Sequence, residues 1–281
     1  MSSALNGPVD LSQCVAQVKS AKHDEGPGLL RTLSIIVTHA EHESAIASLN
    51  GLLIDRSAGR FREAMSVEPM DLLKFGDTLF DNRGNLRTWV KEDESRRGTG
   101  CWGSELNHGR MVYIQSISVR EDMTGEGIGS WILQKLFSSR HVGAEDHVFC
   151  CPSLLDCDPL SEDVEAKLED VVRFFRKNHF RRIGFTQYFA YSPQKTQPSR
   201  GIPPDSDANP EDMWNGPGAT FTSDMRSKYP LHHAIVTDKS DNIVVLIRSM
   251  HAADPSCVHT QDYQGFFPVH AAAMAELYGF G

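Results

Sequence analysis

Long apolar runs are missing from this 281-residue sequence, and a membrane-spanning helix needs about 18 consecutive apolar residues. The opening segment, MSSALNGPVDLSQ, also lacks the basic and then apolar pattern of a secretory signal. These two absences predict a cytoplasmic protein without membrane partners, and the nucleus stays open as a second compartment.

Positive charge is scarce as well. The sequence has 28 lysines and arginines against 37 acidic residues, which gives a formal net charge of -9. Non-specific binding to nucleic acid depends on a basic surface, so we expect no nucleic-acid partner. Any anionic ligand must then be held by local geometry and not by an excess of basic side chains.

Cysteine is sparse too, because six residues in a chain of this length do not suggest a disulfide framework. The nearest approach to a metal cluster is Cys150, Cys151 and Cys157, and no second pair at ligand spacing accompanies it. We expect buried or strand cysteines and no metal, with a zinc site as the alternative.

Proline, serine, glycine and aspartate concentrate over residues 194–220, a composition typical of a linker. This segment divides the chain into a domain over 31–193 and a smaller unit over 221–281, which suits a length above that of one ordinary domain. Residues 1–30 show no lasting periodicity, so we expect a partly ordered lead-in there.

The larger domain mixes strand and helix signals, which predicts an α/β fold of the α+β kind, with a mainly antiparallel sheet flanked by helices. Short β-branched runs indicate strands, apolar spacings of three and four indicate helices, and Asn-Gly-type turns indicate hairpins. The expected elements are strands at 33–40, 111–119, 147–151 and 185–191, helices over 44–65, 130–139 and 161–178, and a hairpin around 82–85.

Three alternating glycines, Gly125, Gly127 and Gly129, lie between an expected strand and an expected helix. Glycine lets the main chain curve closely around a ligand, and the N–H groups at the start of a helix attract anions. The segment therefore predicts a diphosphate-binding loop, with a merely flexible loop as the alternative. A P-loop is excluded because no lysine follows the last glycine, and the G-x-G-x-x-G order of a dinucleotide fold fits weakly.

At these residues the sequence resembles the GNAT family of N-acetyltransferases. The family signature Arg/Gln-x-x-Gly-x-Gly/Ala is matched over Thr124 to Gly129 at both glycines, and the first position departs from it. A second segment, FFRKNHF from Phe174 to Phe180, is similar to the Phe-Tyr-x-Lys-x-Gly-Phe that often ends the following long helix in the family. GTGCWGSEL and RRIGFTQYFAYS look like segments of fungal members. The resemblance covers about residues 31–193.

The resemblance implies the GNAT acyl-CoA N-acyltransferase fold, acetyl-CoA as the acyl donor and an amine as the acceptor. In this family the pantetheine arm of coenzyme A lies between two strands that splay at a bulge. The residues implied to bind it belong to the strand end, the glycine loop and the end of the long helix: Ile117, Ser118, Val119, Thr124, Gly125, Glu126, Gly127, Ile128, Gly129, Ser130, Phe175 and Lys177.

Catalytic groups are less clearly marked. A lysine amine, with a pKa of about 10.4, must lose a proton before it attacks, so a base or a water relay is needed. The candidates for this role are Glu121, Asp122 and Glu105. The usual acid of the family is the tyrosine of Phe-Tyr, and Phe175 stands in its place. The side chains that remain to protonate the leaving thiolate are Tyr188, Ser153, Tyr191 and Cys151.

The tail repeats one phrase, YPLHHA from Tyr229 to Ala234 and FPVHAA from Phe267 to Ala272. It resembles the Thr-Pro-Leu-His-x-Ala-Ala of ankyrin repeats, which implies a small helical unit that can bind a protein partner. We expect the histidine of each phrase to form hydrogen bonds within its repeat.

The leading hypothesis is an N-acetyltransferase that moves an acetyl group from acetyl-CoA to an amine of a small molecule or a protein. Thr124 and Phe175 depart from the family pattern at two functional positions. The alternative is therefore a catalytically weak or inactive coenzyme A-binding scaffold that works through protein–protein interactions of the ankyrin-like tail.

Overall fold

A computed structural model describes residues 9–56, 59–67, 70–94, 96–154, 164–209, 229–237, 243–261 and 267–277. The chain divides into two compact units, Met1–Asn209 and Pro210–Gly281.

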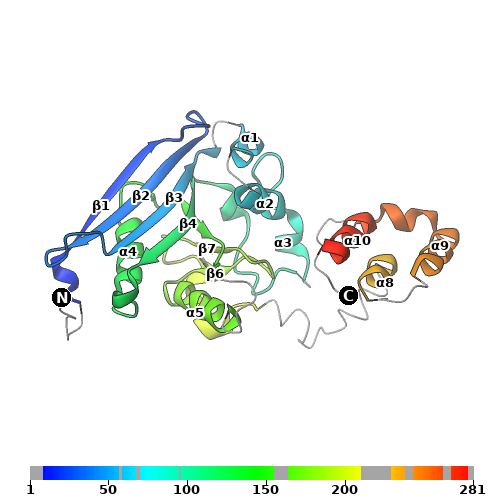
Figure 1. The fold of residues 1–281 in the computed structure, drawn as a ribbon. Coiled ribbons are helices and arrows are strands. Elements are labelled where there is room, and N and C mark those ends of the chain that lie inside the picture. Colours follow the sequence, from blue (N-terminus) through cyan, green and yellow to red (C-terminus); the bar gives the residue numbers. More distant parts are fainter. Residues whose placement is uncertain are drawn as a thin grey trace. The chain divides into compact units, whose positions relative to one another are not determined.

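A seven-stranded sheet is the frame of the first unit (Figure 1). The strand order is β1-β2-β3-β4-β5-β7-β6, and among these strands β4 and β5 form the one parallel pair. This confirms a mixed α/β class with a mainly antiparallel sheet. The strands are β1 Cys14–Lys22, β2 Leu30–His39, β3 Ala47–Ile54, β4 Met111–Val119, β5 His147–Cys150, β6 Arg181–Arg182 and β7 Phe189–Tyr191.

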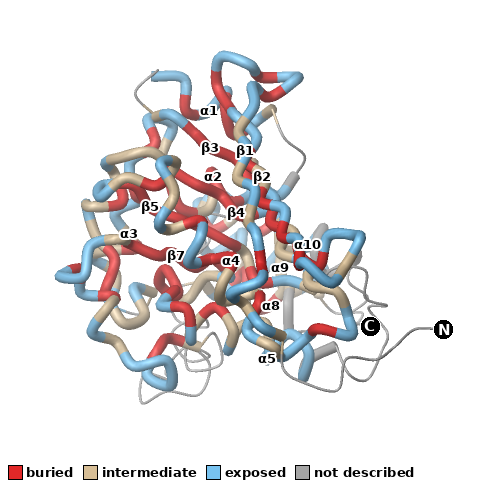
Figure 2. The backbone as a smooth tube through the Cα atoms, turned by 90° about the vertical axis from the view of Figure 1, so that its left-hand side faces the viewer, coloured by how far each residue is buried: buried red, intermediate tan, exposed pale blue. Residues whose placement is uncertain are grey.

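Helices pack on both faces of this sheet. On one face lie α4 (Ile128–Phe137) and α5 (Val164–Lys177), and on the other lie α1 (Phe61–Met65), α2 (Met70–Leu79) and α3 (Thr88–Glu92). Successive side chains of a strand point to opposite faces, so β4 contributes Val112 and Ile114 to one core and Met111 and Tyr113 to the other. Figure 2 shows that buried residues follow the strands.

The prediction of a helix over 44–65 was wrong, because residues 47–54 form β3 and α1 starts only at Phe61. Leu49 and Leu53 have helical spacing, and residues 51–54 are buried on both faces, so the second half of β3 lacks the alternation that marks a half-exposed strand. Gly51 also needs close contact with β4, since a Cβ at this residue would lie 2.6 Å from the carbonyl oxygen of Tyr113.

The lead-in expected over residues 1–30 contains a regular strand, so that prediction was wrong for β1. The strand pairs with β2 along its whole length, from Cys14 opposite His39 to Lys22 opposite Arg31. The strand signal of β1 is weak because only every second residue of this edge strand packs on the core, and several of these residues are small or polar.

The turn at 82–85 forms, but helices flank it where strands were expected. The carboxylate of Asp81 accepts a hydrogen bond from the backbone N–H of Asn85 at 2.9 Å. A single β-bridge joins Phe80 and Leu86, between the end of α2 and the start of α3. The side-chain capping of a turn is a local property, whereas strand pairing beyond it is not.

Residues 194–209 were expected to begin a linker, and this boundary was wrong because they pack on the first unit. The side-chain amide of Gln197 donates to the carbonyl oxygen of Cys101 at 2.9 Å. The Asp207 carboxylate accepts a hydrogen bond from Arg176 on α5 at 3.1 Å. Composition alone does not reveal such buried polar contacts. Residues 210–220 of the expected linker lie outside the described residues.

The remaining elements lie close to their expected positions. The strand at 111–119 is β4, and the helices and strand that follow it are α4, β5 and α5. The last expected strand, 185–191, is shorter, since β7 covers only Phe189–Tyr191 and pairs with β6.

The second unit contains α8 (Pro230–Thr237), α9 (Ile243–Ala253) and α10 (Pro268–Leu277). Each copy of the repeated phrase starts a helix at its proline, a residue suited to the first helical position. The Nδ1 atom of His270 accepts a hydrogen bond from the backbone N–H of Phe267 at 3.1 Å, within the repeat as expected.

Candidate functional site

Strands β4 and β5 separate part of the way along the sheet. They pair from Met111 opposite His147 to Ile114 opposite Cys150, after which β5 ends and β4 continues to Val119. The register between β3 and β4 shifts at the same level, so Gln115 is an extra residue on β4. Such a bulge bends a strand. Residues 115–119 therefore border a gap in the sheet.

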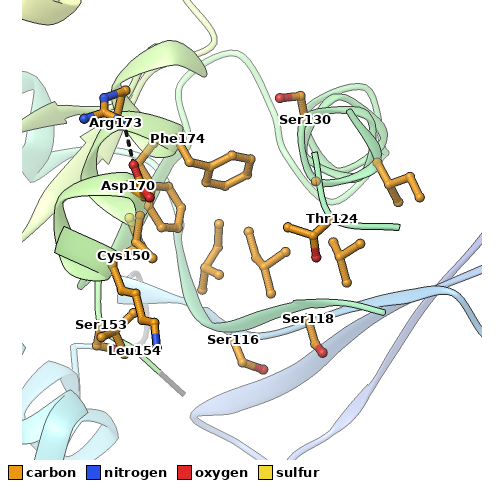
Figure 3. A pocket seen from close by; sticks show the side chains of 18 of the residues that line it. Ser116, Ser118, Thr124, Ser130, Cys150, Ser153, Leu154, Asp170, Arg173 and Phe174 are labelled. Carbon is orange, nitrogen blue, oxygen red and sulfur yellow. Dashed lines mark hydrogen bonds and ion pairs between the residues drawn. The ribbon is translucent and has the colours of Figure 1, made fainter. Parts of the chain in front are cut away.

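A cavity of about 870 Å³ occupies this gap (Figure 3). Its walls are β4, the glycine loop, the first turn of α4, the residues after β5 and one side of α5. The structure thus brings together three segments that are far apart in the sequence. Every residue predicted to bind coenzyme A, apart from Glu126, lines this cavity.

Glu126 has a different role. Its carboxylate accepts a hydrogen bond from the backbone N–H of Val9 at 3.2 Å, and the residue is not part of the cavity wall. Glu126 was expected at the site as part of the backbone of the glycine loop, and the structure directs its side chain to Val9 and not to the cavity.

Two glycines of the loop have a backbone conformation that other residues rarely adopt. Gly125 and Gly127 have φ angles of +90° and +84°, a region that L side chains rarely adopt. Gly127 is the N-cap of α4 and offers no side chain to cap it. The N–H groups of the first helical turn have no intrahelical acceptors, and the helix dipole adds positive potential there. This wall of the cavity can therefore hold an anion without a basic side chain.

A short polar contact fixes the start of α4 to the end of α5. The hydroxyl of Ser130 accepts a hydrogen bond from the side-chain amide of Asn178 at 3.0 Å. The same amide donates to the carbonyl oxygen of Phe174 at 2.9 Å. Ser130 therefore positions the first turn of α4 in addition to lining the cavity.

The end of α5 is a Schellman cap. The N–H of Phe180 donates to the carbonyl oxygen of Phe175, and the N–H of His179 donates to that of Arg176, each at 3.1 Å. The rings of Phe175 and Phe180 pack edge to face with centroids 5.2 Å apart. His179 takes the left-handed position of the cap, with a φ angle of 66°.

The structure separates the candidate catalytic residues. Glu121 and Ser153 line the cavity, as does Cys151, whose pKa is raised to about 11 by burial. Tyr188 is not at the cavity: it packs on the other face of the sheet, with its ring 5.3 Å from that of Phe75. Burial raises the pKa of Tyr188 to about 12. The prediction of Tyr188 as an acid at this site was therefore wrong.

Two of the alternatives also lie elsewhere. The ring of Tyr191 stacks on Phe137 with centroids 3.8 Å apart. The carboxylate of Glu105 accepts hydrogen bonds from Gly103 and Gln197. Neither Tyr191 nor Glu105 belongs to the described cavity wall.

Most of one side of α5 was missed as a wall of the cavity, because only Phe175 and Lys177 near the end of the helix were predicted. Figure 3 shows Asp170, Arg173 and Phe174 on this helix, and the carboxylate of Asp170 lies 2.5 Å from Arg173. The missed signal was the spacing of three and four residues that places a set on one side of a helix. That set includes Lys167, Asp170, Val171, Phe174 and Lys177.

Cys150 is buried in β5, as expected, and Cys151 follows it directly. Cys157 lies outside the described residues. Within the part of the chain that the structure describes, no three candidate ligands lie together in a way that could hold a metal ion.

No family model matches the chain, and comparison with curated proteins gave no match. None of the described helices is long and apolar enough to cross a membrane. Function must therefore be inferred from the cavity itself.

Proposed function

We propose that this chain is an N-acetyltransferase of the GNAT type, which transfers an acetyl group from acetyl-CoA to an amine. The observation that carries the proposal is the cavity between the diverging strands β4 and β5, with the glycine-capped start of α4 at its wall.

The residues present suit the donor. Its diphosphate would lie against the backbone N–H groups from Gly125 to Ser130, where two glycines leave room beside the main chain: a Cβ at Gly125 or Gly127 would have no atom within 4 Å. Its pantetheine arm would run along residues 117–119, bonding to the strand as an additional strand would. The basic side chains of Lys167, Arg173 and Lys177 also line the cavity, so a polyanion would meet positive charge there although the chain has a net charge of -9.

Bound acetyl-CoA supplies an activated acyl group, whose C–S bond breaks as the amine nitrogen bonds to the carbonyl carbon. Backbone N–H groups near Ile117 would stabilise negative charge on the carbonyl oxygen. Glu121, at the cavity wall, is the proposed acceptor of the amine proton, directly or through water.

Proton donation to the departing thiolate is weak at this site. Phe175 has no hydroxyl group, and the groups at the cavity wall that carry an exchangeable proton include Ser153 and Cys151. Because a free thiol has a pKa of about 8.5, the thiolate can leave without an acid, and we expect slow turnover.

The cap of α5 supports the alignment with the family. His179 occupies the position where the family motif has glycine, and it adopts the left-handed conformation that glycine favours. The backbone thus keeps the geometry of the motif although its side chain has changed.

The proposal is tested by two measurements on the purified full chain. Calorimetry with coenzyme A should show one site per chain, and incubation with acetyl-CoA and a panel of amines should release free thiol. An absence of coenzyme A binding would contradict the proposal, because acetyl-CoA is its acyl donor.

A second candidate follows from Phe175, which is buried and lacks the acidic hydroxyl. In this case the chain is a coenzyme A-binding scaffold whose ankyrin-like tail recruits a protein. Tight coenzyme A binding without thiol release from any amine would favour it.

A further inference from the structure

Part of the sheet is not covered by α1, α2 and α3. Directly paired residues of neighbouring strands share a face of the sheet. On the face that also carries these three helices, two rows of such neighbours run from β4 to β1. We name these eight residues the polar strip. One row is Ser116, Asn50, Ser34 and Lys19, and the other is Ser118, Ser48, Ile36 and Gln17. All eight are exposed or half-buried.

The polar strip is continuous with the cavity. Ser116 and Ser118 belong to the strip and also line the cavity, because β5 no longer pairs with β4 at this level. Figure 3 shows both serines on β4, across the cavity from Ser130. One molecule can therefore bind along β4 on the side of α4 and α5, and a second molecule bound on the polar strip can reach it at Ser116 and Ser118.

The strip changes character along its length. Next to the cavity it is uncharged and rich in hydrogen-bonding groups, and the amide of Asn50 donates to the hydroxyl of Ser116 at 3.3 Å. At the outer strand one row ends in Lys19 and the other in the uncharged Gln17. A complementary molecule is therefore neutral and polar near the cavity and acidic at its far end.

The width of the strip indicates the size of that molecule. Ser116 and Lys19 are separated by three strand spacings of about 4.8 Å, or about 14 Å in all. This distance equals about four residues of extended chain at about 3.3 Å each. A single amino acid would not cover it.

The cavity wall favours one kind of amine. An N-terminal amine has a pKa of about 7.7, so much of it is neutral at a pH of about 8, whereas a lysine amine needs a strong base. Glu121 is exposed, and the other carboxylate at the wall, Asp170, is paired with Arg173.

We infer that the acceptor is a polypeptide with a free N-terminus, extended across the polar strip, with an acidic side chain about four residues from its amine that pairs with Lys19. This inference rests on the proposed acetyltransferase function. The peptide would place its amine at the Ser116 edge of the cavity and its first side chains over Asn50 and Ser34.

The test uses the full chain, acetyl-CoA and three hexapeptides with serine, threonine and asparagine at the first four positions. They differ only in glutamate, alanine or lysine at the fifth position, and thiol release reports kcat/KM. We expect kcat/KM for the glutamate peptide to exceed that for the alanine peptide about twofold to fivefold, and kcat/KM for the lysine peptide to fall below that for the alanine peptide. Lys19→Glu should invert this order.

Lys22→Glu is the matched control. It makes the same charge change on the same strand, three residues on and therefore on the opposite face, and should leave the order unchanged. If Lys19→Glu does not alter the preference, or if small amines are acetylated and the peptides are not, the inference is wrong while the acetyltransferase stands. If calorimetry shows no coenzyme A binding, both fail.

Discussion

The ring of Phe174 lies directly against Gly129: a Cβ added at Gly129 would be only 3.0 Å from the Cε2 atom of the ring. The contact joins the first turn of α4 to the last turn of α5, two segments that are both cavity walls. Gly129 is thus required for close packing, whereas Gly125 and Gly127 are required for their backbone conformation.

Gly129→Ala should destabilise the fold by about 1 kcal/mol, because the strain of moving Phe174 to accept the methyl group outweighs the preference of about 0.5–1 kcal/mol for alanine over glycine in a helix. Urea denaturation measures the change. Gly201→Ala is the control, since a Cβ at Gly201 meets no atom within 4 Å and its φ angle is not positive. Equal stability of the Gly129 variant and the wild type would contradict the packing role.

Gly127→Asp should reduce coenzyme A affinity at least about tenfold, because it adds strain and like charge at the anion-binding turn. Gly127→Asn separates the two effects, since asparagine tolerates a positive φ angle and carries no charge. We expect the asparagine variant to lie between the wild type and the aspartate variant in calorimetry. An unchanged affinity for Gly127→Asp would count against a diphosphate at this turn.

His179→Gly should stabilise the chain by about 0.5–1 kcal/mol. The side chain of His179 is exposed and its φ angle of 66° is unfavourable for a residue with a Cβ, so glycine relieves strain and loses little packing. Urea denaturation again provides the measurement. A loss of stability would show that the contacts of the imidazole stabilise the fold by more than the strain at His179 destabilises it.

Asp207→Asn should cost about 1–2 kcal/mol of stability, because it removes the charged partner of Arg176, while the burial that raises the pKa of Asp207 offsets part of the ion-pair energy. The exposed side-chain fractions of the pair are 14% for Arg176 and 0% for Asp207. Asp205→Asn, an exposed neighbour in the same segment, should change stability by less than about 0.5 kcal/mol. Similar values for the two variants would mean that the ion pair does not hold residues 194–209 in place.

Stability should fall in acid through His147. Burial, followed by the nearby Arg56, lowers the pKa of this histidine from 6.5 to about 4, so the unfolded chain binds the proton more readily than the folded one. The stability that the neutral His147 contributes is fully present above a pH of about 6.5. It is lost as the pH falls towards about 4, by at most about 1.4 kcal/mol per pH unit. Urea denaturation at several pH values should give a shallower dependence for His147→Asn. Identical slopes would contradict a buried neutral imidazole.

The sequence by itself determined the elements whose signals are local. The strand that becomes β4, the glycine loop, α4 and α5 each carry their own pattern of apolar spacing and backbone freedom, so their order and the residues of the loop could be predicted. The repeated phrase of the tail predicted a helical unit, and α8 and α10 begin at the prolines of its two copies.

Only the tertiary structure decided which of these residues meet. β3 was missed because its second half, residues 51–54, is buried on both faces and has no alternation, and β1 because an edge strand needs few apolar residues. The side of the sheet on which Tyr188 packs depends on strand register, and the anchoring of Asp207 depends on a partner 31 residues away on α5. Both are set by pairings between distant segments, which one-dimensional patterns do not encode.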